Sequence, residues 1–80
     1  MKRKGKYLRT EEELKKFGAR VRLLRINKGM TMQELVDLSD IEYSQISRIE
    51  RGIINTSLST IFVIAKILEI EPKKFFEEEV

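Results

Sequence analysis

The segment 43–52 carries hydrogen-bonding side chains on one face of a predicted helix. Ile46 and Ile49 lie three residues apart, so both fall on one helical face and point inward. The opposite face carries polar side chains long enough to reach base edges: Tyr43, Ser44, Gln45, Ser47 and Arg48. Arginine suits bidentate contact with guanine and glutamine suits adenine, while serine is permissive and tyrosine reaches a phosphate or a thymine methyl. The chemistry offered is hydrogen bonding in a DNA groove, and the alternative is an ordinary solvated helix face.

A second short helix and a tight turn are predicted to position this face. Thr31 and Glu34 form an S/T-x-x-E capping box, which predicts that a helix starts at Met32. In the turn 38–42, Asp40 tolerates left-handed backbone better than most residues. Glu42 is a poor N-cap by geometry, although its charge suits the helix dipole. The two helices and their turn form a helix-turn-helix.

The first helix is predicted for Thr10–Lys28, and Gly29 ends it. Thr10 and Glu13 make a second capping box, and three consecutive glutamates in the first turn suit the helix dipole better than catalysis. Apolar residues spaced three or four positions apart share one helical face and are core candidates: Leu14, Phe17, Val21 and Leu24.

Two further helices are predicted after Gly52, which is placed to be a left-handed C-cap. Ser57 caps the fourth helix, and Pro72 opens a final helix at its favoured first position. The inward stripe of the fourth helix is predicted as Leu58, Ile61, Ile64, Ala65 and Leu68. One of Phe75 and Phe76 is expected to close the core of an all-α domain.

Four segments resemble, in order and spacing, the XRE family of Cro and lambda-repressor-like DNA-binding domains. They are VRLLRINKG, TMQEL, ISRIERG and SLSTIFVIAKILEI. The resemblance covers about residues 17–76 and implies a five-helix lambda-repressor-like domain, with the helix-turn-helix at the second and third helices. It also implies which residues of the third helix contact DNA bases: Tyr43, Ser44, Gln45 and Arg48.

The family pattern also implies contacts with DNA phosphates. The family's glutamine at the start of the second helix is Met32 here, and methionine cannot hydrogen-bond a phosphate. That contact is therefore expected to use backbone N–H groups and Gln33. The other phosphate candidates are Arg51, Asn55 and Lys28.

Arg25 follows the predicted core residue Leu24, at the edge of the buried stripe, where an unpaired charge is costly. In the family the matching arginine pairs with the glutamate of the I-E-x-G segment, which is Glu50 here. The implied ion pair would fix the recognition helix against the first helix. The alternative is two unrelated surface charges.

The apolar residues on the outer side of the fourth helix suggest a partner. Together with Leu23 and Ile26, they leave more apolar surface than a monomer of this size is expected to expose. A symmetric homodimer is favoured over a monomer, with contacts from Phe62, Val63, Ile67, Phe75 and Phe76.

Length and charge divide the 80 residues into three regions. Residues 1–9 form a basic arm, predicted to be flexible, with five basic residues and no acidic one. Residues 10–76 form one helix-turn-helix domain, and residues 77–80 form an acidic tail. The arm either wraps nucleic acid or is a solubilising tail.

Several classes of function are excluded by composition. The chain has no cysteine and no histidine, which excludes disulfides and the usual zinc ligands. It shows no catalytic motif, phosphate loop, membrane-spanning run or signal peptide. We therefore expect no enzyme, no cofactor, no metal and no membrane, and a cytoplasmic protein.

The expected function is sequence-specific binding of operator DNA by a homodimer that represses or activates transcription. Relatives this short include phage repressors and the controller proteins of restriction-modification systems. Two alternatives stay open: an antitoxin-like or adaptor module whose main partner is a protein, and a coactivator-like bridge.

Overall fold

The computed structural model describes residues 10–77. The predicted basic arm at 1–9 and most of the predicted acidic tail, 78–80, lie outside this range. Residues 10–77 contain four α-helices and one short 3-10 helix, and no strand. The elements are α1 (Glu11–Asn27), α2 (Met32–Ser39), α3 (Tyr43–Arg51), α4 (Leu58–Leu68) and η2 (Pro72–Phe76). The fold is therefore all-α, as predicted, but the fifth predicted helix is a single 3-10 element.

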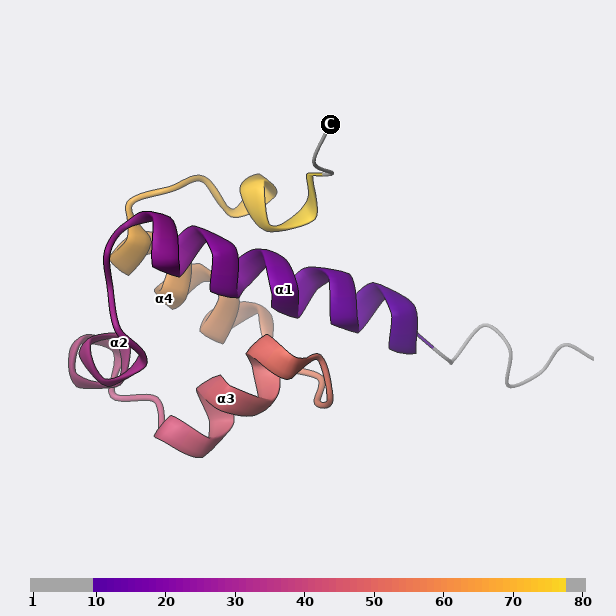
Figure 1. Cartoon of the computed structure of the whole chain (residues 1–80), viewed down its shortest axis with the longest axis horizontal. Coiled ribbons are helices and arrows are strands. Elements are labelled where there is room, and N and C mark those ends of the chain that lie inside the picture. The colour runs from indigo at the N-terminus through magenta and orange to yellow at the C-terminus, as the bar shows by residue number, and fades with distance from the viewer. Residues whose placement is uncertain (1–9, 78–80) are drawn as a thin grey trace, which may run out of the picture.

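The long helix α1 is the centre of the arrangement (Figure 1). It packs against α3 on one side and η2 on the other, while α2 packs against α3 and α4. Among the described residues, no helix combines the length and the apolar character that crossing a bilayer requires.

The hydrophobic core takes residues from every element. Its buried members are Val21, Leu35, Ile46, Ile49, Ile61, Ile64, Ala65, Leu68 and Phe75. Phe17 and Leu24, predicted as core, are only partly buried and pack against this cluster. The prediction for Leu58 was wrong, because this residue is 67% exposed. It is the first residue of α4, and a helical side chain tilts toward the helix N-terminus, so Leu58 points past the end of the core.

The caps of α2 and α4 form as the sequence indicates. The Thr31 hydroxyl accepts from the Glu34 N–H at 3.0 Å, and the Glu34 carboxylate accepts from the Thr31 N–H at 2.8 Å. The Ser57 hydroxyl likewise accepts from the Thr60 N–H at 3.1 Å. Both helices therefore begin at the residue that the sequence predicts.

The predicted capping box of α1 does not form. Thr10 precedes the helix with φ −127° and ψ 34° and makes no side-chain cap hydrogen bond. A capping side chain requires extended backbone at this position, and Thr10 does not have it. Only its carbonyl takes part, accepting from the Leu14 N–H at 2.8 Å.

Two left-handed residues end the helices of the helix-turn-helix. Asp40 has φ 67° at the end of α2, and Gly52 has φ 72° at the end of α3. Asp40 thus adopts the left-handed backbone expected in the turn between α2 and α3.

A glycine brings α1 and α3 into close contact. Gly18 is buried, and a Cβ added there would lie 2.7 Å from the Glu50 carbonyl oxygen and would also clash with the carbonyl of Ile49. Both obstacles are backbone atoms, so no side-chain rotation would relieve the clash. Gly18 therefore sets the distance between α1 and the recognition helix.

Gly18→Ala is expected to lower the free energy of unfolding by about 3 kcal/mol or more, at the upper end of overpacking costs. Urea denaturation followed by circular dichroism measures the change. Gly29→Asn is the control, because an added Cβ at Gly29 meets nothing within 4 Å and asparagine tolerates its left-handed φ of +70°. Equal small losses in both variants would contradict the close packing of α1 on α3.

Candidate nucleic-acid interface

The recognition helix α3 starts with little help from its N-cap. Glu42 is extended and makes no side-chain cap hydrogen bond, so only its carbonyl takes part, accepting from the N–H groups of Gln45 and Ile46. Ile46, Ile49 and Glu50 form the buried face of the helix. Tertiary packing, and not the cap, therefore holds α3 in place.

The predicted base-contacting residues lie on the open side of α3. Tyr43, Ser44 and Arg48 are exposed, whereas Gln45 is half-buried. Ser44 and Arg48 are four residues apart and so share one helical face. The structure thus leaves these side chains accessible to a ligand.

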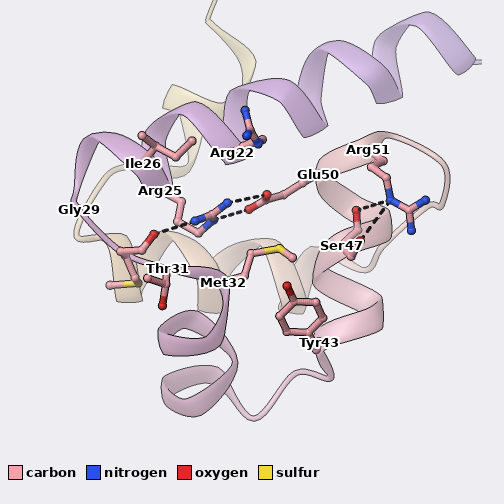
Figure 2. A pocket seen from close by; sticks show the side chains of 11 residues that line it. Arg22, Arg25, Ile26, Gly29, Thr31, Met32, Tyr43, Ser47, Glu50 and Arg51 are labelled. Atoms are coloured by element: carbon pink, nitrogen blue, oxygen red, sulfur yellow. Dashed lines mark hydrogen bonds and ion pairs between the residues drawn. The ribbon is translucent and has the colours of Figure 1, made fainter.

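A buried ion pair fixes the orientation of α3. Arg25 Nε donates to Glu50 Oε2 at 2.7 Å, and Arg25 Nη2 donates to Glu50 Oε1 at 3.0 Å. Figure 2 shows this pair between α1 and α3. The two residues are only 7% and 8% exposed. The pair expected from the family pattern therefore forms, with bidentate geometry, and the alternative of two surface charges is wrong.

Arg25 also binds the loop between α1 and α2. Its Nη1 donates to the Met30 carbonyl oxygen at 2.7 Å. One guanidinium thus joins α1, the approach to α2, and the end of α3. The hydrogen bonds that Arg25 donates to Glu50 raise the pKa of Arg25, and burial lowers it. The charge of Glu50 and the nearby Tyr43 raise this pKa further, so the guanidinium keeps its charge.

The predicted phosphate contacts lie on several elements. Gln33 on α2 is exposed, and its Nε2 donates to Asp37 Oδ1 at 2.9 Å. Asn55 is exposed in the loop before α4. Lys28, at the end of α1, forms an exposed ion pair of 3.5 Å with Glu69. Any phosphate that binds Gln33 or Lys28 competes with these carboxylates.

Arg51 is anchored by the preceding turn of its own helix. Its Nε donates to the Ser47 hydroxyl at 3.2 Å and to the Ser47 carbonyl at 3.3 Å. The sequence predicted Ser47 among the polar side chains of the outward face, and not as a partner of Arg51. The serine–arginine spacing of four residues was the available signal, because such residues are neighbours on a helix.

A cleft of about 610 Å³, which the sequence did not predict, lies beside the recognition helix. It opens between α1, the start of α2 and α3, and Figure 2 shows the side chains that line it. Arg22 lines it from α1, one helical turn before Arg25. The signal for Arg22 was its spacing of three from Arg25, but only packing shows that α3 lies opposite.

Four of the five side chains predicted as dimer contacts are exposed or half-buried, and the fifth is buried. Phe62 and Val63 are 49% and 38% exposed, and Ile67 is half-buried. Phe76 is exposed, with its ring 5.3 Å from that of Phe17. Phe75 is 2% exposed and belongs to the core, so its assignment to a dimer contact was wrong.

Within residues 10–77, no group of three His, Cys, Asp or Glu side chains is arranged to hold a metal ion. The site therefore consists of an open polar helix face, exposed cations and a cleft. These features, on a helix-turn-helix fold, define a protein of the DNA-binding class.

Comparisons with known proteins agree with assignment to a DNA-binding class. The HTH_3 family, described as helix-turn-helix, matches residues 21–75. The control protein C.BamHI of Bacillus amyloliquefaciens is 39% identical over 62 residues, which cover 76% of each chain. The restriction-modification controller protein C.AhdI from Aeromonas hydrophila superposes with a TM-score of 0.78 at 42% identity, over 81% of this chain and 98% of that one. The restriction-modification controller protein C.Esp1396I superposes with a TM-score of 0.70 at 33% identity, over 79% and 83%.

The chain belongs to the HTH_3 (XRE) family of helix-turn-helix DNA-binding transcriptional regulators, which are not enzymes. The resemblance noted in the sequence is thereby confirmed.

Arg25→Met is expected to lower the free energy of unfolding by about 3 kcal/mol or more, because it leaves the Glu50 carboxylate buried without a partner. Lys28→Met, which breaks an exposed pair, should cost less than about 1 kcal/mol. Replacing Glu50 by Leu in the Arg25→Met background should recover part of the loss. Urea midpoints of the variants check this, and similar small losses in both single variants would rule out a buried pair.

Proposed function

We propose that the protein binds operator DNA as a homodimer and that each α3 enters one major-groove half-site. The observation that supports this most directly is the polar face of α3, held outward by the buried pair of Arg25 and Glu50. An α-helix is about 10–12 Å across with its side chains, and the major groove is about 12 Å wide. Helix α3 therefore fits the groove with its exposed face against the bases.

The proposed base contacts divide by chemistry. Arg48 is exposed and suits a bidentate contact with guanine, while Gln45 suits adenine. Ser44 and Tyr43 complete the surface, and Tyr43 also reaches toward the phosphates. Four polar residues are proposed to contact the DNA backbone on either side of the groove that holds α3: Arg51, Asn55, Gln33 and Lys28.

A second copy of the chain is the proposed partner for the apolar side chains of α4 and η2. A two-fold dimer would place two recognition helices about 34 Å apart, one turn of DNA, or a multiple of that. Phe62, Val63, Ile67 and Phe76 are the proposed contacts.

The likeness to the controller proteins C.BamHI, C.AhdI and C.Esp1396I supports a more specific role. We infer that this protein also controls transcription of restriction-modification genes. Selection of bound duplexes from a random pool tests this inference, because the recovered operator can be sought upstream of such genes. An operator found only elsewhere would contradict it.

Replacing Gln45 and Arg48 by alanine should remove sequence preference more than total affinity. These side chains are proposed to read bases, whereas nonspecific binding depends on phosphate contacts. Each lost contact should cost about 1–3 kcal/mol of discrimination. Gel-shift titrations of the selected operator and of a random duplex measure both quantities. Unchanged preference in the two single variants and in the double variant would disprove the assignment of α3.

Val63→Asp should dissociate the dimer, because a desolvated carboxylate would face the apolar surface of the second copy. Sedimentation equilibrium measures the association, and operator affinity should fall with it. Leu58→Asp is the control, since Leu58 lies on the same helix, is more exposed, and is outside the proposed contact. A monomeric wild type, or a dimer unaffected by Val63→Asp, would exclude this interface.

Adaptor function is the rival proposal, favoured by the same apolar surface. An antitoxin-like or adaptor module, or a coactivator-like bridge, would bind protein there and would bind DNA weakly or not at all. A DNA affinity that does not change with salt concentration, or no association at low ionic strength, would favour the rival.

A further inference from the structure

Glu42, the N-cap residue of the recognition helix, has a carboxylate that no neighbouring side chain binds. The residue is exposed, its backbone is extended, and its side chain makes no cap hydrogen bond with the helix. Among residues 10–77, no side chain forms an ion pair with it. Thr31 and Ser57, the N-caps of α2 and α4, each accept a hydrogen bond from their own helix. The carboxylate of Glu42 therefore differs from these caps in being open to a ligand.

The start of α3 is the end of this helix that projects away from the rest of the domain. The last turn of α3 is held against α1 by the pair of Arg25 and Glu50, and an added Cβ at Gly52 would clash with the backbone of α1. Figure 1 shows the first turn of α3 at the lower edge of the molecule, farther from α1 than the last turn. A recognition helix places its N-terminal residues against base edges. In the proposed complex the Glu42 carboxylate would therefore lie beside the bases.

A carboxylate in the major groove is costly unless a base donates a hydrogen bond to it. The groove is about 12 Å wide, so a negative charge at its centre lies about 6 Å from the phosphates on each side and is repelled by them. Cytosine presents its N4 amino donor at the groove edge, whereas guanine and thymine present the acceptors O6 and O4. Adenine has an amino donor at N6, but its N7 acceptor lies beside it. Cytosine is therefore the base whose edge best suits a carboxylate.

We propose that Glu42 is a specificity-determining residue and that its carboxylate accepts a hydrogen bond from the N4 amino group of one cytosine in each half-site. The proposal rests on the proposed function, because it uses the same entry of α3 into the major groove. It adds a cytosine to the guanine assigned to Arg48 and the adenine assigned to Gln45. The absent cap then has a consequence for binding, because a serine or threonine at this position would bind its own helix instead.

The length of α3 limits where this cytosine lies. Glu42 and Arg48 are six residues apart, which is about 9 Å along a helix that rises about 1.5 Å per residue. Successive base pairs are about 3.4 Å apart. The cytosine read by Glu42 should therefore lie within about three base pairs of the guanine read by Arg48.

The test compares Glu42→Ala with Glu71→Ala in the full chain. Glu71 is the matched control, because it is also an exposed, extended N-cap glutamate without a side-chain cap hydrogen bond, and its ion pair with Lys73 is exposed. It begins η2, on the other side of α1 from α3. Selection from a random pool should give the wild type a fixed cytosine in each half-site. Glu42→Ala should lose preference at that position alone, by at least about fivefold, the lower limit for one base contact. Glu71→Ala should select the wild-type half-site.

Affinity for random DNA distinguishes base reading from a structural role. Glu42→Ala removes a negative charge from the neighbourhood of the phosphates, so its affinity for a random duplex should rise about twofold. If Glu42 served only the dipole of α3, its loss would instead weaken binding to the operator and to random DNA alike. Gel-shift titrations of both duplexes measure the two affinities.

A second measurement identifies the amino group itself. The fixed cytosine of the selected operator is replaced by a 2-pyrimidinone analogue, which lacks the N4 amino group. The wild type should bind this duplex at least about fivefold more weakly. Glu42→Ala should lose much less, because the contact is already absent. Weaker pairing of the analogue with guanine affects both proteins and cancels in the comparison.

Several results would overturn the proposal. They are a wild-type half-site without this cytosine, an unchanged half-site or a lower affinity for random DNA in Glu42→Ala, an equal change in Glu71→Ala, or equal losses of both proteins on the analogue. Circular dichroism of each variant verifies folding, which the exposed positions allow. A wild type that selects no sequence refutes the proposed function instead, so the two failures are distinguishable.

Discussion

The buried ion pair between Arg25 and Glu50 is the constraint on which the DNA-facing surface depends. Helix α3 has a weak N-cap and only nine residues, so it has little stability of its own. The bidentate contact ties its last turn to α1, and the third hydrogen bond of Arg25 holds the Met30 carbonyl before α2. Gly18 sets how closely the two helices approach. The orientation of α3 is thus fixed by contacts with α1.

The molecule has two exposed surfaces of different chemistry. The polar face of α3 and the cleft beside it offer hydrogen bonds and positive charge, which suit DNA. The outer sides of α1 and α4 carry exposed apolar residues such as Leu23 and Phe62, which suit another protein chain. Because the α3 surface and the α4 surface use different residues, the two kinds of binding can take place together.

Two residues at helix ends reduce the stability of the domain. Asp40 and Glu69 both adopt left-handed backbone at helix ends, where glycine is favoured, at a cost of about 1–2 kcal/mol each. A domain of this size has a small core and little stability in reserve. This small reserve makes the packing of Gly18 and the pairing of Arg25 more consequential.

Local patterns in the sequence determined the order of the helices, their capping at Thr31 and Ser57, the left-handed turn at Asp40 and the polar face of α3. These features depend on residues within a few positions of one another, so their spacing is sufficient to predict them. The failure at Thr10 is also local, since a capping side chain needs extended backbone at its own residue. The failure at Leu58 is not local, because the end of the packed core decides whether its side chain is buried. Tertiary structure alone decided that Phe75 and not Phe76 fills the core, and that Arg22 lines a cleft together with residues of α3. These outcomes depend on how distant segments pack, and periodicity within one helix carries no information about what lies opposite it.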